Sequence, residues 1–246
     1  MGLRRMLGLK GPKKTTARKK APPVRPPVNA MLWQRAAESS ADFIERHLRT
    51  AMLFDERDAL HRFALDDLPE EGLLLEFGVF KGQSINGFAD DLARKQDARP
   101  IHGFDAFEGL QEHWHGVGYH RSQNRFNLNG RLPDVRGNVR LVPGWIDDTL
   151  PGFLTDNPGP IAFLHVDTDT YLPAKTVLGL CKSRLAVGSV ILFDELLAHP
   201  GWEDGEFRAL QEELDPSTYE WIGFSGWRAA LRITRAPEGR PDHGTA

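Results

Sequence analysis

The sequence lacks the cysteine pairs and the long apolar segments on which several classes of protein depend. Cys181 is the only cysteine among the 246 residues, which excludes an intrachain disulfide and a cysteine-rich metal site. No apolar run approaches the roughly 20 residues that a membrane-spanning helix needs. We therefore expect a cytoplasmic protein without a membrane span.

Charge is distributed unevenly along the chain. Residues 1–30 contain nine Lys and Arg and no acidic residue, whereas the remaining 216 residues carry 22 basic and 34 acidic side chains. Binding to a phosphate backbone requires a cationic surface. The acidic body of the chain therefore argues against a nucleic-acid enzyme, and we expect no nucleic-acid partner.

The ends of the chain differ from its middle. Residues 1–30 are basic and rich in Pro, with few large apolar side chains, so we expect a disordered tail there, and a second one over 236–246. Residues 31–65 repeat apolar side chains at helical spacing, which predicts helices at about 31–50 and 55–64. This helical cap could cover a sheet edge, form a lid over a ligand or mediate a homo-oligomer, and the sequence does not choose.

The segment that organises the rest of the chain runs from Leu73 to Ser84 and reads LLLEFGVFKGQS. An apolar run of strand length ends in Glu76, a turn with Gly78 and Gly82 follows, and apolar residues then recur along one face of a helix. Such a unit brings backbone N–H groups and a helix N-terminus against a bound ligand. An ordinary strand–helix connection would show the same glycines, so the rest of the chain decides.

Strands and helices continue to alternate toward the C-terminus. Further strands are predicted near 100–104, 139–142, 161–166 and 187–193, with helices that start near 147, follow residue 170 and span about 203–213. Two last strands are predicted near 219–223 and 228–234. The pattern predicts one α/β domain over residues 66–235, with a doubly wound, mostly parallel seven-stranded sheet and a terminal antiparallel hairpin.

Acidic residues follow four of the predicted strands, namely Glu76, Asp105, Asp167 and Asp194. In an open α/β sheet the carboxyl ends of the parallel strands lie along one edge, where ligands bind. Any one of these acids could instead be a helix N-cap, a position that favours Asp. Four on one edge, with a further acid beside two of them, favour a ligand site.

Five sequence blocks in this order resemble a known family. LLLEFGVFKGQS, HGFDAFEGL, PGWIDDTLP, FLHVDTDTYLP and GSVILFDE, over about residues 70–235, are similar to class I S-adenosylmethionine-dependent methyltransferases. They most resemble the macrocin O-methyltransferase family, whose members methylate sugar hydroxyls of natural products with Mg²⁺ bound, and more distantly the catechol O-methyltransferases. The resemblance implies a Rossmann-like methyltransferase fold and an O-methyltransferase for a small polar, sugar-like or natural-product acceptor.

The resemblance also implies how S-adenosylmethionine would be bound. Glu76 would meet the cofactor's ammonium group directly or through water, and the turn around Gly78 and Gly82 would leave room for the methionine part. Ser84, in the first turn of the helix, would donate to the carboxylate with help from the helix dipole. Asp105 would accept from both ribose hydroxyls.

The block PGWIDDTLP would bind the adenine. The amino group of the adenine would donate to Asp147 or Asp148, and Trp145 or Ile146 would lie against the ring. Asp147 is equally consistent with a helix N-cap, and Trp145 with a core position.

A Mg²⁺ site is implied by Asp167, Asp194 and Glu195. Hard cations take oxygen ligands, and three clustered carboxylates would repel one another without a cation. The macrocin family has two aspartates where this chain has Asp194 and Glu195. Alignment on the catechol enzymes would instead place a metal ligand on His165, with Thr168 and Thr170 standing where those enzymes have a catalytic lysine nearby. We favour Asp167, because an acid at a strand end faces the ligand edge whereas His165 is expected to be buried.

The long connection over residues 106–133 is expected to contact the acceptor. Loops of this length in a compact domain are usually functional or disordered, and aromatic side chains beside polar groups suit a sugar. Its candidate contacts are His113, Trp114, His115, Tyr119, His120, Arg121 and Arg125. The candidate general bases are Asp169 and His199.

Two other functions remain open for the same fold. A non-catalytic protein that binds S-adenosylmethionine would keep the pocket without turnover. An NAD-dependent oxidoreductase would need a Gly-x-Gly-x-x-Gly turn, which residues 76–82 lack.

Overall fold

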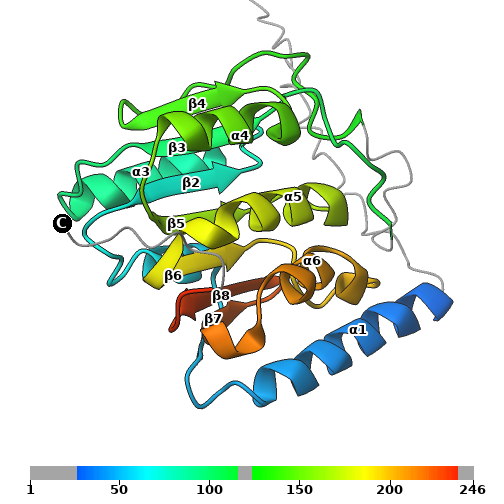
Figure 1. Cartoon of the computed structure of the whole chain (residues 1–246). Coiled ribbons are helices and arrows are strands. Elements are labelled where there is room, and N and C mark those ends of the chain that lie inside the picture. Colours follow the sequence, from blue (N-terminus) through cyan, green and yellow to red (C-terminus); the bar gives the residue numbers. More distant parts are fainter. Residues whose placement is uncertain (1–26, 116–123, 238–246) are drawn as a thin grey trace, which may run out of the picture.

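The computed structural model describes residues 27–115 and 124–237, which fold around one eight-stranded sheet. The strand order is β1-β7-β8-β6-β5-β2-β3-β4 (Figure 1). The strands are β1 (Met52–Leu53), β2 (Leu73–Phe77), β3 (Ile101–Asp105), β4 (Val139–Pro143), β5 (Ile161–Val166), β6 (Leu185–Phe193), β7 (Tyr219–Ser225) and β8 (Arg228–Ile233).

Strand directions confirm the predicted sheet. All neighbouring strands are parallel except β8, which runs antiparallel to both β6 and β7. The predicted number of seven strands is one too low. The additional strand, β1, has two residues and pairs with β7, and so short a segment leaves no periodic pattern in the sequence.

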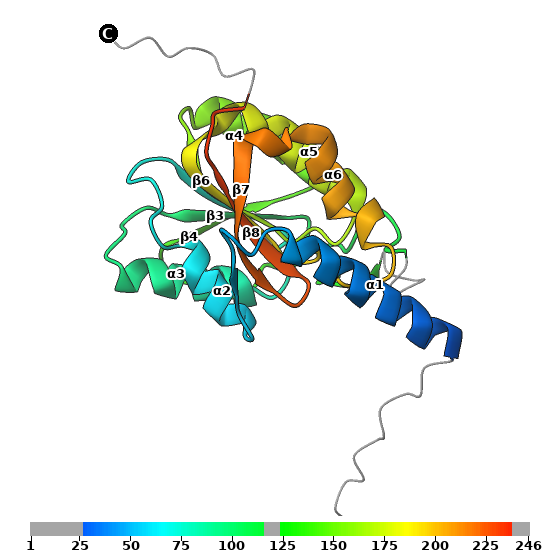
Figure 2. The same cartoon turned by 90° about the horizontal axis from the view of Figure 1, so that it is seen from below.

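Helices cover both faces of the sheet (Figure 2). One face carries α4 (Ile146–Asp156), α5 (Tyr171–Cys181) and α6 (Glu206–Glu213), and the other carries α2 (Arg57–Ala64) and α3 (Gln83–Arg94). Side chains alternate along a strand, so Leu75 and Phe77 of β2 pack under the first layer and Leu74 packs under the second. This alternation decides below which strand residues can reach the ligand edge.

The N-terminal helices differ from the prediction. Helix α1 (Pro27–Glu45) begins four residues earlier than expected and ends five residues earlier, and a turn over 46–50 leads into β1. Phe43 of α1 packs against Phe207 and Trp221, whereas Leu60 of α2 lies in the core on the opposite face. The two helices therefore do not form one continuous cap.

The remaining N-terminal and C-terminal predictions fall largely outside the structure. Of the two expected tails, residues 1–26 and 238–246 lie outside the described residues, and residues 27–30 belong to α1. Within 27–115 and 124–237, no helix combines the length and the apolar character needed to cross a membrane.

The chain reverses its direction of travel across the sheet at β2. Strands β3 and β4 lie on one side of β2, and β5 and β6 lie on the other. Backbone hydrogen bonds hold the three strand ends together, from Asp167 to the Phe77 carbonyl and from Gly78 to the Phe104 carbonyl, each 2.9 Å long. In open α/β sheets, ligands bind in the crevice beyond the strand ends at such a switch point.

Candidate functional site

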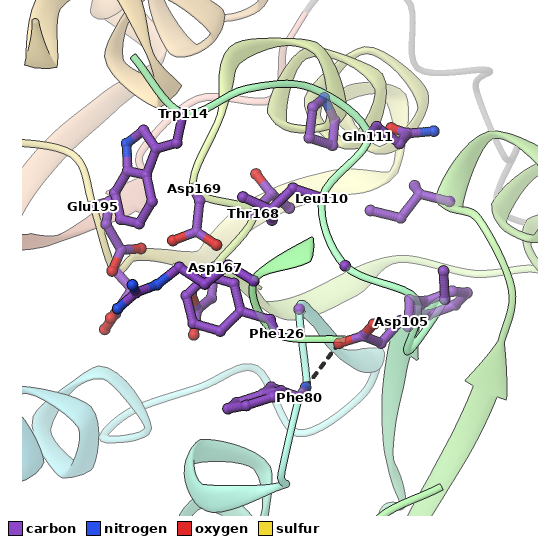
Figure 3. Close-up of a pocket in the computed structure, with 18 of the residues that line it drawn as sticks. Phe80, Asp105, Leu110, Gln111, Trp114, Phe126, Asp167, Thr168, Asp169 and Glu195 are labelled. Carbon is purple, nitrogen blue, oxygen red and sulfur yellow. Dashed lines mark hydrogen bonds between the residues drawn. The ribbon is translucent and has the colours of Figure 1, made fainter. Parts of the chain in front are cut away.

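A cavity of about 310 Å³ lies beyond the carboxyl ends of the strands at this switch point. The turn after β2, the loop after β3, the start of α4 and the ends of β5 and β6 all contribute to its wall (Figure 3). The predicted site residues that line it are Gly78, Asp105, Trp145, Asp167, Asp169, Asp194 and Glu195. Residues that the sequence assigned to cofactor binding and acids that it assigned to the metal site or to proton transfer thus line the same cavity.

Gly78 is required by the close approach of two strand ends. Its φ is +91°, and a Cβ at this position would lie 1.8 Å from the carbonyl oxygen of Asp167. Any side chain would therefore push β5 away from β2. The absence of a side chain keeps the turn amides next to the acids at the end of β5.

Asp105 has a structural task that the sequence did not reveal. Its Oδ2 accepts from the backbone N–H of Val79 (2.9 Å) and of Phe80 (2.7 Å, dashed in Figure 3), and its Oδ1 accepts from Phe107 N–H (2.6 Å). Because each carboxylate oxygen has two acceptor positions, one on Oδ1 remains. The expectation that Asp105 accepts from both ribose hydroxyls is therefore reduced to one direct contact.

Glu76, Gly82 and Ser84 lie away from the cavity. The Glu76 side chain is fully buried, accepts from Ser84 Oγ (2.9 Å) and lies 3.3 Å from His165 Nδ1. Glu76 shares the sheet face of Leu74, so it points toward α3 and not toward the ligand edge. Neither Glu76 nor Ser84 lines the cavity, and their contacts with the cofactor stay predictions. Gly82 precedes α3 with φ +76° and shapes the turn.

Of the residues predicted to bind the adenine, some line the cavity and others do not. Trp145 and Ile146 line the cavity, whereas Asp147 and Asp148 are exposed in the first turn of α4. Gln111 donates to Asp147 Oδ2 (3.3 Å), which joins α4 to the loop after β3. Trp145 is therefore better placed than the two aspartates to contact a ring in the cavity.

Asp167, Asp194 and Glu195 form the acid cluster that the sequence predicted. Each offers a carboxylate oxygen within 4.8 Å of the others. Burial raises the pKa of Asp167 well above its usual range, and the charge of Asp194 raises it further. Burial and Asp194 raise the pKa of Glu195 in the same way. Excess negative charge thus makes protons or a cation bind favourably here.

Asp194 is the exception, because it is paired with Arg228. The guanidinium donates from Nε to Oδ1 (2.5 Å) and from a terminal nitrogen to Oδ2 (2.9 Å). His61 Nε2 lies 3.7 Å from the same Oδ1. Burial opposes ionisation of Asp194, but His61 and Arg228 hold its pKa below the usual range. Arg228 thus supplies a cation from within the protein.

Asp169 and Glu206 extend the acid cluster toward α6. Burial raises the pKa of Asp169 well above its usual range and Glu206 raises it further, whereas Arg125 lowers it. Burial raises the pKa of Glu206 to about 8, although Thr168 opposes the shift by donating its N–H (3.0 Å) and Oγ1–H (3.2 Å) to Oε1. Figure 3 shows the Asp169 and Glu195 carboxylates turned toward the same space.

The second candidate base, His199, is poorly placed for proton transfer. It is buried and absent from the cavity wall. Its Nε2 lies 2.9 Å from the Glu195 carbonyl oxygen and its Nδ1 lies 3.3 Å from that of Pro200. Both ring nitrogens therefore face acceptors, and burial lowers the pKa of the imidazole.

The connection after β3 contributes to the wall as expected. Trp114, Arg125 and Phe126 line the cavity, whereas His113 and His115 are exposed. Tyr119, His120 and Arg121 lie outside the described residues.

Three residues of the site escaped the sequence analysis. Trp227 lines the cavity and stacks on Trp33 of α1 with ring centroids 5.7 Å apart. Trp227 lies in the turn between β7 and β8 and Arg228 begins β8, where no motif marks either residue. Glu206 follows Glu203 and Asp204, so in the sequence it is indistinguishable from an exposed, acidic helix start.

The donor atoms in the acid cluster fit a hard divalent cation. Oε2 of Glu195 is buried and has no hydrogen-bond partner among the described residues, and the ligands on offer are all carboxylate oxygens. Asp167 and Glu195 are the stronger candidates. Both carboxylate oxygens of Asp194 already accept a hydrogen bond from Arg228, so a cation there would share this carboxylate with the guanidinium.

Comparisons with known proteins point to methyltransferases. Residues 75–196 match a protein-family model described as a methyltransferase domain. A Streptomyces olivaceus protein, 8-demethyl-8-(2,3-dimethoxy-alpha-L-rhamnosyl)-tetracenomycin-C 4'-O-methyltransferase, is 32% identical over 142 residues, which are 50% of this chain and 52% of that protein. The alignment thus spans about half the length of that relative.

Two solved structures resemble most of the chain. The apo structure of a TDP-rhamnose 3'-O-methyltransferase from calicheamicin biosynthesis has a TM-score of 0.51 and 27% identity, covering 85% of this chain and 96% of that chain. The O-methyltransferase NovP has a TM-score of 0.58 and 19% identity, covering 84% and 100% respectively. At that identity, the second likeness bears on the fold alone.

Proposed function

We propose that the chain is a class I S-adenosylmethionine-dependent methyltransferase and that it acts as an O-methyltransferase, which the matched methyltransferase domain and the likeness to an O-methyltransferase structure support. The proposed reaction transfers the methyl group of S-adenosylmethionine to a hydroxyl of a small polar acceptor, sugar-like or a natural product. One observation carries the proposal: the glycine turn and the acid cluster line the same cavity. A donor held at the turn and an acceptor held at the acids would therefore meet.

The two sides of the cavity suggest a division of tasks. On the donor side, Gly78, Asp105 and Trp145 would bind the methionine part, a ribose hydroxyl and the adenine. On the acceptor side, Trp114 and Trp227 offer aromatic faces of the kind that sugars pack against. The curated relative and the calicheamicin enzyme are both named for methylation connected with rhamnose, which supports a sugar-like acceptor.

The chemistry is an in-line displacement that depends mostly on positioning. The acceptor oxygen forms a bond to the methyl carbon as the carbon–sulfur bond breaks, and sulfur leaves with the electron pair as S-adenosylhomocysteine. Asp169 is the proposed base for the hydroxyl proton, because burial makes its carboxylate more basic than usual. Asp167 and Glu195, beside Asp194, would hold Mg²⁺, which when bound lowers the pKa of a hydroxyl and fixes its position.

Labelled methyl transfer tests the proposal directly. S-adenosylmethionine with a labelled methyl group is incubated with TDP-rhamnose, p-nitrophenyl α-L-rhamnoside and catechol, with Mg²⁺ or with excess chelator. We expect transfer to a rhamnose hydroxyl and little transfer in chelator. Full activity in chelator would remove the metal from the mechanism.

Binding measurements separate the other two functions. Calorimetry with S-adenosylmethionine, S-adenosylhomocysteine and NAD should show binding of the first two only. Preference for NAD would overturn the proposal in favour of an oxidoreductase. Cofactor binding without turnover on a broad panel of acceptors would favour a non-catalytic binding protein.

We further propose a cytoplasmic location and self-association through α1. The lone cysteine, Cys181, is buried and suits a reducing compartment. Helix α1 exposes three apolar side chains, Val28, Met31 and Leu32, which a second copy would cover. Sedimentation of the full chain and of a variant with polar residues at these positions measures the self-association.

A further inference from the structure

We propose that Glu206 is a positioning residue that fixes Asp169 in the cavity wall. The inference rests on the proposed methyl transfer, in which Asp169 takes the acceptor proton. Glu206 itself does not line the cavity, so it would act through the turn that carries Asp169.

The turn over Thr168, Asp169 and Thr170 is strained. Asp169 has a φ of +63°, which a residue with a side chain seldom adopts, and the N–H of Thr170 donates to the carbonyl of Thr168 at 2.7 Å. A hydrogen bond between residues two apart closes a three-residue turn, and such turns with positive φ are rare. All three residues are buried, at 4–8% exposure, so solvent does not stabilise the turn. Something in the surrounding protein must hold it.

Glu206 is the side chain that holds it. Oε1 accepts from both the backbone N–H and the hydroxyl of Thr168, at 3.0 and 3.2 Å. One buried carboxyl group at the start of α6 is therefore bonded to the turn that follows β5 and carries Asp169.

Stability alone does not explain a carboxyl group at this position. Glu206 is 1% exposed, and its Oε2 has no hydrogen-bond partner among the described residues. A buried polar atom without a partner destabilises the folded state. Unfavourable groups that persist next to strained backbone are typical of sites where geometry serves function.

The two hydrogen bonds that Glu206 makes to Thr168 need an acceptor oxygen and do not need a charge. Glutamine at position 206 would keep the acceptor oxygen and remain neutral, so Glu206→Gln is the conservative replacement and Glu206→Leu is the disruptive one.

The test compares these two variants with Glu203→Leu, which makes the same change at an exposed position three residues earlier. Crystal structures with S-adenosylhomocysteine report the turn, and labelled methyl transfer to TDP-rhamnose reports kcat and KM. In Glu206→Leu we expect loss of the positive φ at Asp169, a fall in kcat of about 10- to 100-fold, and a KM and S-adenosylhomocysteine Kd within threefold of wild type. Glu206→Gln and Glu203→Leu should keep the turn and at least half of kcat.

The outcomes separate this inference from the proposed function. An unchanged Asp169 turn in Glu206→Leu overturns the inference, whether or not the protein has methyltransferase activity. If wild type methylates none of the acceptors, the function fails while the crystal structures still decide the role of Glu206. If Glu206→Leu does not fold, Thr168→Val replaces it, because this change removes only the hydroxyl contact with Glu206. We then expect a partial fall in kcat with KM unchanged. Equal changes in kcat and KM would indicate general disruption and overturn the inference.

Discussion

Replacing Arg228 by Met should destabilise the protein in a way that a divalent cation repairs. Arg228 makes two hydrogen bonds to Asp194, whose side chain is 10% exposed. Removing one partner of a buried ion pair leaves an uncompensated charge and typically destabilises by about 3–5 kcal/mol. Because Asp167 and Glu195 carry further negative charge nearby, we expect a loss of about 3 kcal/mol in the free energy of unfolding when chelator is present.

A bound cation should recover most of that loss. A ligand present at about 100 times its Kd stabilises the folded state by about 2.7 kcal/mol. Urea unfolding followed by circular dichroism, with excess chelator or with MnCl₂, measures both quantities, and an unchanged m-value shows that only stability has changed. Arg228→Met/Asp194→Asn is the matched control, because it removes the unpaired charge and should be more stable in chelator than Arg228→Met alone. A loss below about 1 kcal/mol in chelator, or equal stabilisation of wild type and Arg228→Met by Mn²⁺, would refute the reasoning.

Three further changes probe the rest of the site. Gly78→Ala should lower the free energy of unfolding by about 3 kcal/mol and abolish S-adenosylhomocysteine binding in calorimetry, because the new Cβ would overlap a backbone oxygen. The control Gly87→Ala, whose Cβ would meet open space, should change neither quantity. Asp105→Ala should weaken S-adenosylhomocysteine binding by about ten- to a hundredfold, because the contacts that hold the turn are lost. Asp147→Ala should bind S-adenosylhomocysteine within a few-fold of wild type. Equal losses of affinity in the two variants would contradict the assignment of Asp105 to the cofactor site. Because the pKa of Glu206 is raised to about 8, its contribution to stability is fully present below its ordinary pKa of 4.5 and is lost as pH rises toward about 8. The free energy of unfolding, measured in urea, should therefore fall less over this pH range in Glu206→Gln than in wild type. Parallel pH curves for the two proteins would contradict this prediction.

The fold could be predicted from the sequence because its strongest signals are local. Buried parallel strands appear as short apolar runs, and β5 was predicted with its observed limits. Acids directly after such runs, such as Asp167 and Asp194, had to reach one edge of the sheet because the strands are parallel. The acid cluster therefore follows from topology and strand limits alone.

The direction of individual side chains was harder to predict. Glu76 is the last acid of an apolar strand, yet it shares the face of Leu74 and points away from the cavity. Alternation along β2 contains this information, but the end of a strand is also where a side chain can leave the sheet. Knowing which residue is last in the strand, here Phe77, settles the matter.

Contacts between distant segments could not be predicted. Arg228 reaches Asp194 because β8 pairs with β6, and Glu206 reaches Thr168 because α6 packs beside α5. Neither residue stands in a motif, since each is separated from its partner by more than thirty residues. Only the packing of the whole domain brings these groups together.

The position of β8 has a consequence for the order in which the protein is assembled. Strand β8 lies between β6 and β7, so β7 connects to β6 only once β8, the last strand in the described part of the chain, has been made and inserted. During synthesis, the earlier strands and their acids are available first. Until Arg228 emerges with β8, Asp194 and its acidic neighbours lack this cationic partner, and the nascent chain carries a concentrated negative charge at the growing edge. A ribosome that stops before β8 would therefore release a chain whose sheet is open beside the acid cluster.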